Sequence, residues 1–155
     1  MDFSSETKLS KHFKLEEFEK SQMAYRLGID NRVTDKTIFN NLKNLSEEIL
    51  EPIRNHFGKP FTPNSGYRCL ELNRKLGSRD TSQHTLGQAV DIEIVGIDNE
   101  TLFAYIKNEL DFDQVILEYY DGITPDSGWI HVSYVSPKDN RKNSFAYDGI
   151  NYRVV

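Results

Sequence analysis

Cysteine is almost absent from this sequence, which has one residue of this type, Cys69, in 155 positions. A single cysteine can form no internal disulfide, and it cannot supply the paired thiolates of a cysteine-based zinc site. Any metal site in the chain must therefore be built from histidines and carboxylates.

Basic charge and long apolar runs are lacking as well. The net charge is -5 and the pI is about 5.4, so the clusters of Lys and Arg that bind phosphates are not expected, which excludes a general nucleic-acid binder. No apolar run approaches the length that crosses a bilayer, and residues 1–7 lack the features of a secretion signal. We expect a monomer that does not enter the membrane and is cytoplasmic as synthesised.

Bulky side chains are plentiful enough to build a core. Apolar residues make up 37% of the chain, and nine Phe and eight Tyr supply most of the aromatic residues. A chain of this length is typical of one packed domain, which we expect to span residues 1–155.

Helices are predicted where apolar residues recur every three or four positions. The longest such segment, residues 35–57, reads as an amphipathic helix that Pro52 is expected to bend or break, because proline lacks a backbone donor. Shorter helices are expected over residues 15–20, 69–76 and 99–110.

Strands are predicted where apolar and polar residues alternate. Three segments show this pattern, residues 89–95, 113–120 and 129–135, and two shorter ones, residues 144–147 and 151–155, flank an Asp-Gly turn. This arrangement favours an antiparallel sheet.

Two of these strands carry candidate metal ligands on one face. Val90 and Ile92 alternate with Asp91, so the carboxylate points away from the core, and the same period places His131 on the polar face of its strand. His84 lies seven positions before Asp91, across a glycine that permits a turn. Two imidazoles and one carboxylate suit a catalytic zinc with one position open to water.

The order of several motifs along the chain adds a resemblance. The motifs are Ser65-Gly66-Tyr67-Arg68, Leu72-Asn73, Ser82-Gln83-His84-Thr85-Leu86-Gly87-Gln88-Ala89-Val90-Asp91 and Gly128-Trp129-Ile130-His131-Val132-Ser133. Together they resemble the zinc D-Ala-D-Ala carboxypeptidase family, which includes vancomycin-resistance dipeptidases and phage wall-cutting endopeptidases and shares its fold with the Hedgehog signalling domain. The resemblance implies an α+β fold in which helices pack on one side of an antiparallel sheet. It also implies that His84, Asp91 and His131 bind zinc.

The catalytic base is the point at which the sequence departs from that family. Many relatives carry a Glu three residues before the last His, and here that position is Gly128. Glu118 lies on the preceding predicted strand, which can bring it beside His131, and is the preferred candidate. Asp126 and Glu93 are the rival carboxylates.

Further side chains match family positions that handle substrate. The resemblance gives Arg68 the task of holding the substrate or stabilising an oxyanion, and a structural ion pair is its alternative role. Ser82 matches a serine that contacts substrate, although it can equally cap a turn. Tyr67, Gln83 and Trp129 are additional substrate-binding candidates.

These features predict a zinc metallopeptidase that hydrolyses peptide bonds of bacterial peptidoglycan, as a D-Ala-D-Ala carboxypeptidase or as a stem or cross-link endopeptidase. Its partner is then a peptidoglycan peptide, reached at the cell wall after release. Two other readings stay open: a zinc-stabilised binding domain without activity, and a cytosolic peptidase that does not act on the wall.

Overall fold

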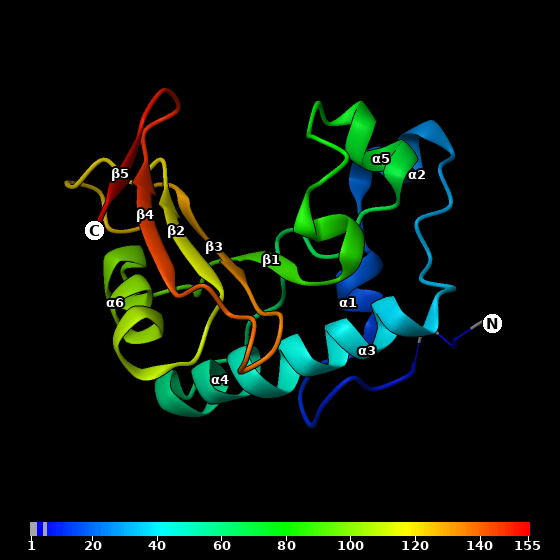
Figure 1. The fold of residues 1–155 in the computed structure, drawn as a ribbon, viewed down its shortest axis with the longest axis horizontal. Coiled ribbons are helices and arrows are strands. Elements are labelled where there is room, and N and C mark those ends of the chain that lie inside the picture. Colours follow the sequence, from blue (N-terminus) through cyan, green and yellow to red (C-terminus); the bar gives the residue numbers. More distant parts are fainter. Residues whose placement is uncertain (1–2, 5) are drawn as a thin grey trace.

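A five-stranded sheet forms the centre of the molecule, as seen in the computed structural model, which describes residues 3–4 and 6–155 (Figure 1). Its strands are short, with three to five residues each. They are β1 (Ala89–Ile92), β2 (Gln114–Glu118), β3 (Trp129–Ser133), β4 (Asn143–Tyr147) and β5 (Tyr152–Val154), in the spatial order β1-β3-β2-β4-β5.

The pairing of the strands makes the sheet mixed. Strand β3 pairs antiparallel with β1 and β2, and β4 pairs antiparallel with β5, but β2 and β4 run parallel. The expectation of a wholly antiparallel sheet is therefore wrong. The physical reason is that both edges of β3 are already occupied, so the chain leaving β3 must pass to the free edge of β2.

The helical segments follow the apolar periodicity of the sequence. They are α1 (Leu15–Glu19), α2 (Gln22–Leu27), α3 (Lys36–Leu45), η1 (Ser46–Leu50), α4 (Glu51–Phe57), α5 (Leu70–Lys75), η2 (Gln83–Leu86) and α6 (Asn99–Glu109). The long helix predicted over residues 35–57 is present as α3, η1 and α4 in succession. Its interruption is a π-helical turn that lies directly before Pro52, which occupies the first turn of α4.

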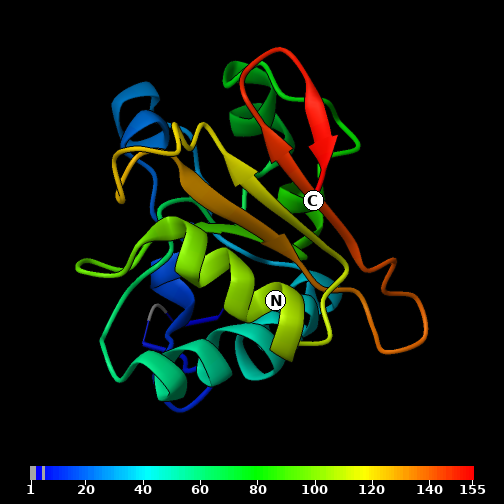
Figure 2. The ribbon, with the colours of Figure 1, turned by 90° about the vertical axis from the view of Figure 1, so that its left-hand side faces the viewer.

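The core lies against one face of the sheet. Figure 2 shows α6 and the α3–α4 segment on the same side of the strands. The side chains buried there from the strands are Val90, Ile92, Val115, Leu117, Ile130 and Val132, and those from the helices include Leu42, Leu45, Ile49, Ile53, Leu102 and Ile106. The prediction that helices pack on one side holds for these elements, while α5 and η2 lie beside the opposite face. That opposite face is consequently free to carry polar groups.

The end of β2 differs from the sequence pattern. The alternation predicts a strand that reaches Tyr120, but β2 ends at Glu118 and Tyr119 adopts a left-handed conformation with φ 58°. The reversal of the backbone turns the ring of Tyr120 towards the core and leaves Tyr119 about half exposed.

No helix in the described part of the chain is both long and apolar enough to cross a membrane.

Candidate functional site

Three side chains that are far apart in the sequence meet on the open face of the sheet. Asp91 on β1 lies directly opposite His131 on β3 in the antiparallel register, and the Nδ1 atom of His131 is 3.0 Å from Asp91 Oδ1. The Nε2 atom of His84, on η2, is 3.5 Å from the same oxygen. One potential ligand atom from each of the three residues lies within 4.8 Å of the others. The structure therefore brings together the three residues that the sequence indicated.

Local backbone contacts hold His84 over the strand. The Oγ atom of Ser82 accepts a hydrogen bond from the His84 backbone N–H at 3.3 Å, and Gly87 ends the short helix in a left-handed conformation. A Cβ atom on Gly87 would approach the carbonyl oxygen of Ile38 to 2.8 Å, so the turn has no room for a side chain. Gly87 therefore permits the turn that places η2, and with it His84, over β1.

A second contact orients the imidazole of His84. Its Nδ1 atom lies 2.8 Å from the carbonyl oxygen of Gly66, a contact in which the ring donates its proton. The Nε2 atom then carries the free lone pair and faces Asp91. A histidine that donates its other ring proton to a backbone carbonyl is the usual arrangement of a metal ligand.

The protonation states of the cluster suit a metal. Burial lowers the pKa of His84, so its imidazole is neutral. Burial alone would raise the pKa of Asp91, but the hydrogen bond with His131 and the proximity of His84 outweigh it and hold that pKa below its usual range. Two histidines and an ionised carboxylate form a donor set that fits zinc, and the cluster could hold such an ion.

Arg68 lies beside the cluster and is mostly buried. Its terminal nitrogen is 3.6 Å from Asp91 Oδ2, while Nε donates to Ser65 Oγ at 3.2 Å and the other terminal nitrogen donates to Asn73 Oδ1 at 3.4 Å. Burial lowers the pKa of Arg68, and the charges of Asp91 and Glu118 oppose that shift. The guanidinium is thus held in a fixed orientation next to the candidate metal ligands.

Glu118 reaches the same cleft from the neighbouring strand. It lies directly opposite Trp129, two residues from His131 on β3, and both residues line the cleft. Burial raises the pKa of Glu118, and the negative charge of Asp91 raises it further. The indole N–H of Trp129 is buried without a well-aligned hydrogen-bond acceptor, yet it is close enough to Glu118 to lower its pKa.

The rival carboxylates lie elsewhere. Glu93 accepts a hydrogen bond from Asn64 at 2.9 Å, and Asp126 is exposed in the loop between β2 and β3. Of these three carboxylates, all in the described part of the chain, Glu118 is the one that lines the cleft with His84, Asp91 and His131.

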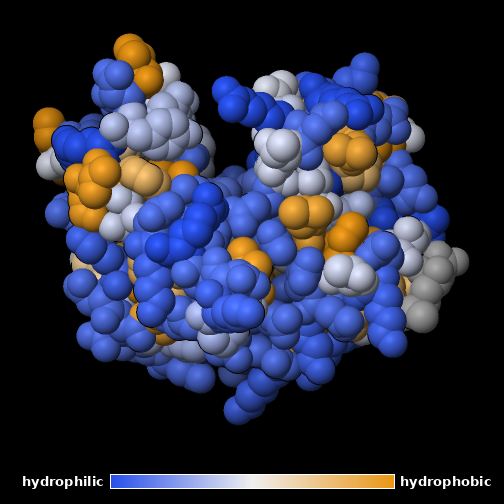
Figure 3. All heavy atoms as spheres, viewed as in Figure 1, coloured by the Kyte–Doolittle hydropathy of each residue, from blue (hydrophilic) through white to orange (hydrophobic). Residues whose placement is uncertain are grey.

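The cleft itself has a volume of about 1230 Å³. It separates the open face of the sheet from residues 76–84, and Figure 3 shows the molecule hollowed between the β4–β5 hairpin and the region of α5. Three of the substrate-binding candidates line it, namely Ser82, Gln83 and Trp129. Tyr67 does not, because its ring packs against the core and borders a separate hollow near α2.

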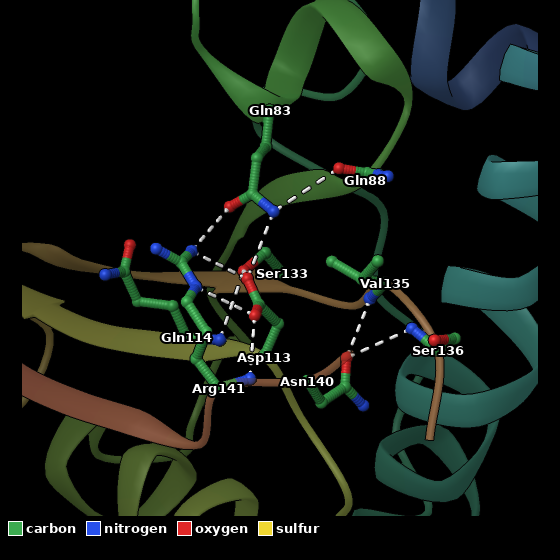
Figure 4. A network of polar contacts seen from close by, with 9 residues as sticks. All are labelled: Gln83, Gln88, Asp113, Gln114, Ser133, Val135, Ser136, Asn140 and Arg141. Carbon is green, nitrogen blue, oxygen red and sulfur yellow. Dashed lines mark hydrogen bonds and ion pairs between the residues drawn. The ribbon is translucent and has the colours of Figure 1, made fainter. Parts of the chain in front are cut away.

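Gln83 belongs to a hydrogen-bond network that the sequence did not indicate (Figure 4). Its amide donates to Asp113 Oδ2 at 3.0 Å, and Arg141 binds the same carboxylate through Nε and a terminal nitrogen, at 3.0 and 2.8 Å. Ser133 Oγ also donates to Asp113 at 2.8 Å, and Arg141 reaches Gln83 Oε1 at 3.3 Å. This network links β2, β3 and the segment before β4 to the helix that carries His84.

Arg141 also lines the cleft, although no motif pointed to it. Asp113 directly precedes β2 and is fully buried, and a buried carboxylate requires a partner. That partner is 28 positions away in sequence, so local patterns could not identify it.

Comparison with known proteins identifies a family for the chain. No curated protein matches the chain significantly. The family model described as Peptidase M15 matches residues 11–133, a segment that contains His84, Asp91, His131, Arg68 and Glu118. Members of this family are zinc metallopeptidases. Since the match covers most of the sequence, the chain belongs to the peptidase M15 family.

Proposed function

We propose that this protein is a zinc-dependent metallopeptidase that hydrolyses peptide bonds of bacterial peptidoglycan, with His84, Asp91 and His131 as the zinc ligands. The observation that carries the proposal is the meeting of these donors, within 4.8 Å of one another, in a cleft that Glu118 and Arg68 also line. A single domain of the Hedgehog/DD-peptidase type, acting as a monomer, is part of the same proposal.

Glu118 is proposed as the general base. Zinc, when bound, polarises the scissile carbonyl and lowers the pKa of a bound water. Glu118 accepts the proton of the attacking water and delivers it to the leaving amine. The raised pKa of Glu118 favours this exchange. A carboxylate whose pKa is closer to the working pH both accepts and returns a proton readily.

Arg68 is proposed to stabilise the charge that develops on the carbonyl oxygen, or to bind a substrate carboxylate. Its contacts with Ser65 and Asn73 fix the guanidinium before substrate arrives, so little reorganisation is needed. Ser82, Gln83 and Trp129 are proposed to contact the peptide along the cleft wall. Tyr67 is assigned no contact, since its ring lies outside the cleft.

A second candidate function, a zinc-stabilised binding domain without activity, is favoured by one observation. The position at which many relatives carry the base is Gly128, which provides no carboxylate. Zinc bound at one ion per chain, together with no cleavage of any substrate, would support this alternative.

The test is digestion of purified peptidoglycan by the zinc-loaded protein, with mass spectrometry of the released muropeptides. Loss of a terminal D-Ala identifies a carboxypeptidase, and a cut within the stem or cross-link identifies an endopeptidase. Free peptides without D-residues, digested in parallel, separate a wall enzyme from a general peptidase. The Asp91→Asn variant is the matched negative control, and cleavage of the free peptides alone would contradict the proposed substrate.

A further inference from the structure

Four aromatic side chains form a row along one wall of the cleft: Trp129, Tyr119, Tyr147 and Tyr152. The ring centroids of Tyr119 and Trp129 are 5.1 Å apart, and those of Tyr119 and Tyr147 are 5.5 Å apart. Tyr147 and Tyr152 stack with centroids 4.3 Å apart and planes inclined by 24°. We call these four residues the aromatic row.

The strand register explains why the row is continuous. Trp129 on β3 lies opposite Glu118 on β2, Glu118 lies beside Tyr147 on β4, and Tyr147 lies opposite Tyr152 on β5. Residues that are directly paired across a sheet project from the same face. The row therefore starts beside the proposed catalytic base and runs across the sheet to its outer strand.

Packing of the core does not account for these rings. Tyr119 and Tyr152 are 47% and 61% exposed, and all three residues of β5 are exposed. Aromatic side chains normally bury most of their surface, so two exposed rings and two half-buried ones along one cleft wall indicate a binding surface. Tyr147 and Tyr152 lie beyond residues 11–133, the segment that matches the family.

The chemistry of the row fits an uncharged ring that carries hydroxyl groups. Its members offer aromatic faces and phenolic oxygens but no carboxylate, ammonium or guanidinium group. Among the charged groups of the cleft, Glu118 lies between Trp129 and Tyr147 in the strand register. Arg68, Arg79 and Arg141 belong to other segments of the lining. Sugar rings present C–H groups on their faces and hydroxyls on their edges, and C–H groups are attracted to the negative face of an aromatic ring.

The size of the cleft also favours an extended ligand. Its volume of about 1230 Å³ exceeds the range of roughly 300–1,000 Å³ that is typical of small-molecule sites. A dipeptide at the metal cluster that contacts Trp129 on β3 would leave the outer rings of the row, Tyr147 on β4 and Tyr152 on β5, uncovered. We propose that the row is a subsite for the sugar rings of a peptidoglycan strand, occupied while the attached stem peptide lies at the metal cluster. This inference rests on the proposed function and assigns Tyr119, Tyr147 and Tyr152 a role in recognising the glycan.

Direct binding of a sugar tests the subsite without requiring catalysis. The probe is a tetrasaccharide of N-acetylglucosamine, an uncharged mimic of the glycan strand, titrated into the zinc-loaded protein and followed by two-dimensional NMR. Saturable shifts are expected at the Trp129 indole N–H and at residues of β4 and β5. Tyr152→Ala and Tyr147→Ala should weaken binding at least tenfold, whereas Tyr152→Phe keeps the ring and should retain most of it.

Tyr25→Ala is the matched control, because Tyr25 is 89% exposed on α2 and does not line the cleft. It should leave sugar binding unchanged. Absence of saturable shifts in the wild-type protein, or equal loss of binding in the Tyr25 and Tyr152 variants, would overturn the subsite.

Turnover supplies a second readout. The ratio of kcat/KM on a glycan-linked stem peptide to that on the same free peptide should fall about tenfold in Tyr152→Ala. An unchanged ratio would mean that the row contacts the peptide or only stabilises the hairpin, and would overturn the proposal. Sugar binding without any cleavage would instead contradict the proposed peptidase function, so the two failures are distinguishable.

Discussion

Gly128 lies against the backbone of Glu118 so closely that a Cβ atom on the glycine would overlap the Glu118 carbonyl oxygen. The same Cβ would lie 2.7 Å from the carbonyl carbon of Tyr119, and Gly128 has φ 68°. Both features exclude a side chain at this position. The backbone of residues 118–120 thus fills the space that a side chain at position 128 would need, and Glu118 places its own carboxylate in the cleft.

Replacing Gly128 should therefore destabilise the protein more than replacing another left-handed glycine. Gly122 has φ 78°, and a Cβ atom on it would meet no other atom within 4 Å, so Gly122→Ala should cost only the conformational penalty of about 1–2 kcal/mol. Gly128→Ala adds a clash with rigid backbone and should cost more than about 3 kcal/mol. Urea unfolding of both variants measures the difference, and equal losses would contradict the close packing.

Glu118→Gln should lower kcat by roughly 10²–10⁴-fold while leaving zinc content unchanged, because the amide keeps the shape of the side chain but accepts no proton. Glu93→Gln and Asp126→Asn are the matched controls, since both carboxylates lie outside the cleft. Each control should retain nearly full activity. If Glu118→Gln stays active and one of the controls loses activity, the residue replaced in that control is the general base instead.

The meeting of Asp91 and His131 was predictable because the alternation on each strand is a local signal. Val90, Ile92 and their counterparts on β3 fix which face Asp91 and His131 occupy, and the register places these two residues opposite each other. The helix over residues 35–57 was equally visible, since apolar periodicity and Pro52 together indicated both its extent and its interruption.

The missed features depend on contacts between distant segments. The parallel pairing of β2 with β4 follows from the occupied edges of β3, which no single segment reveals. Arg141 is 28 positions from Asp113 in sequence, and the aromatic row exists only because four strands align. The left-handed backbone of Tyr119 likewise breaks an alternation that the sequence alone would continue.

Metal dependence can be measured apart from activity. Purified protein should contain one zinc ion per chain, and a chelator should remove both the ion and any hydrolysis, with zinc restoring both. His131→Ala should weaken zinc binding by at least about 100-fold, because it removes a direct ligand. His56→Ala is the control: this ring stacks on Tyr105, 4.0 Å away between centroids, and is no member of the cluster. Equal zinc affinity in the two variants would exclude His131 as a ligand.

Arg68→Lys should separate a catalytic role from a structural ion pair. Lysine keeps the positive charge near Asp91 but cannot reproduce the planar set of donors that bonds Ser65 and Asn73. We expect kcat/KM to fall about tenfold or more at nearly unchanged stability. A variant with wild-type kinetics and lower stability would indicate the ion pair alone.

The ion pair between Asp113 and Arg141 should make the free energy of unfolding depend on pH. Neither residue belongs to the cluster of His84, Asp91 and His131. Burial would raise the pKa of Asp113, but hydrogen bonds from Arg141, with those of Gln83 and Ser133, hold it well below its usual range. The folded state therefore binds a proton less readily than the unfolded state. The stabilisation is complete above the unfolded pKa of about 3.9 and is lost as the pH falls below it.

Arg141→Met should reveal this contribution in urea unfolding of the metal-free protein. At pH 7 the variant leaves a buried carboxylate short of a partner and should lose about 1–2 kcal/mol, a figure reduced because the guanidinium is half exposed. The gap from wild type should stay constant between pH 7 and about pH 5 and narrow below about pH 4, where Asp113 is protonated in the unfolded state. Arg74→Met removes an exposed pair with Asp80 at the same 2.8 Å distance and should change stability little. A gap that is the same for both variants, or that widens in acid, would show that Arg141 does not act through the buried charge of Asp113.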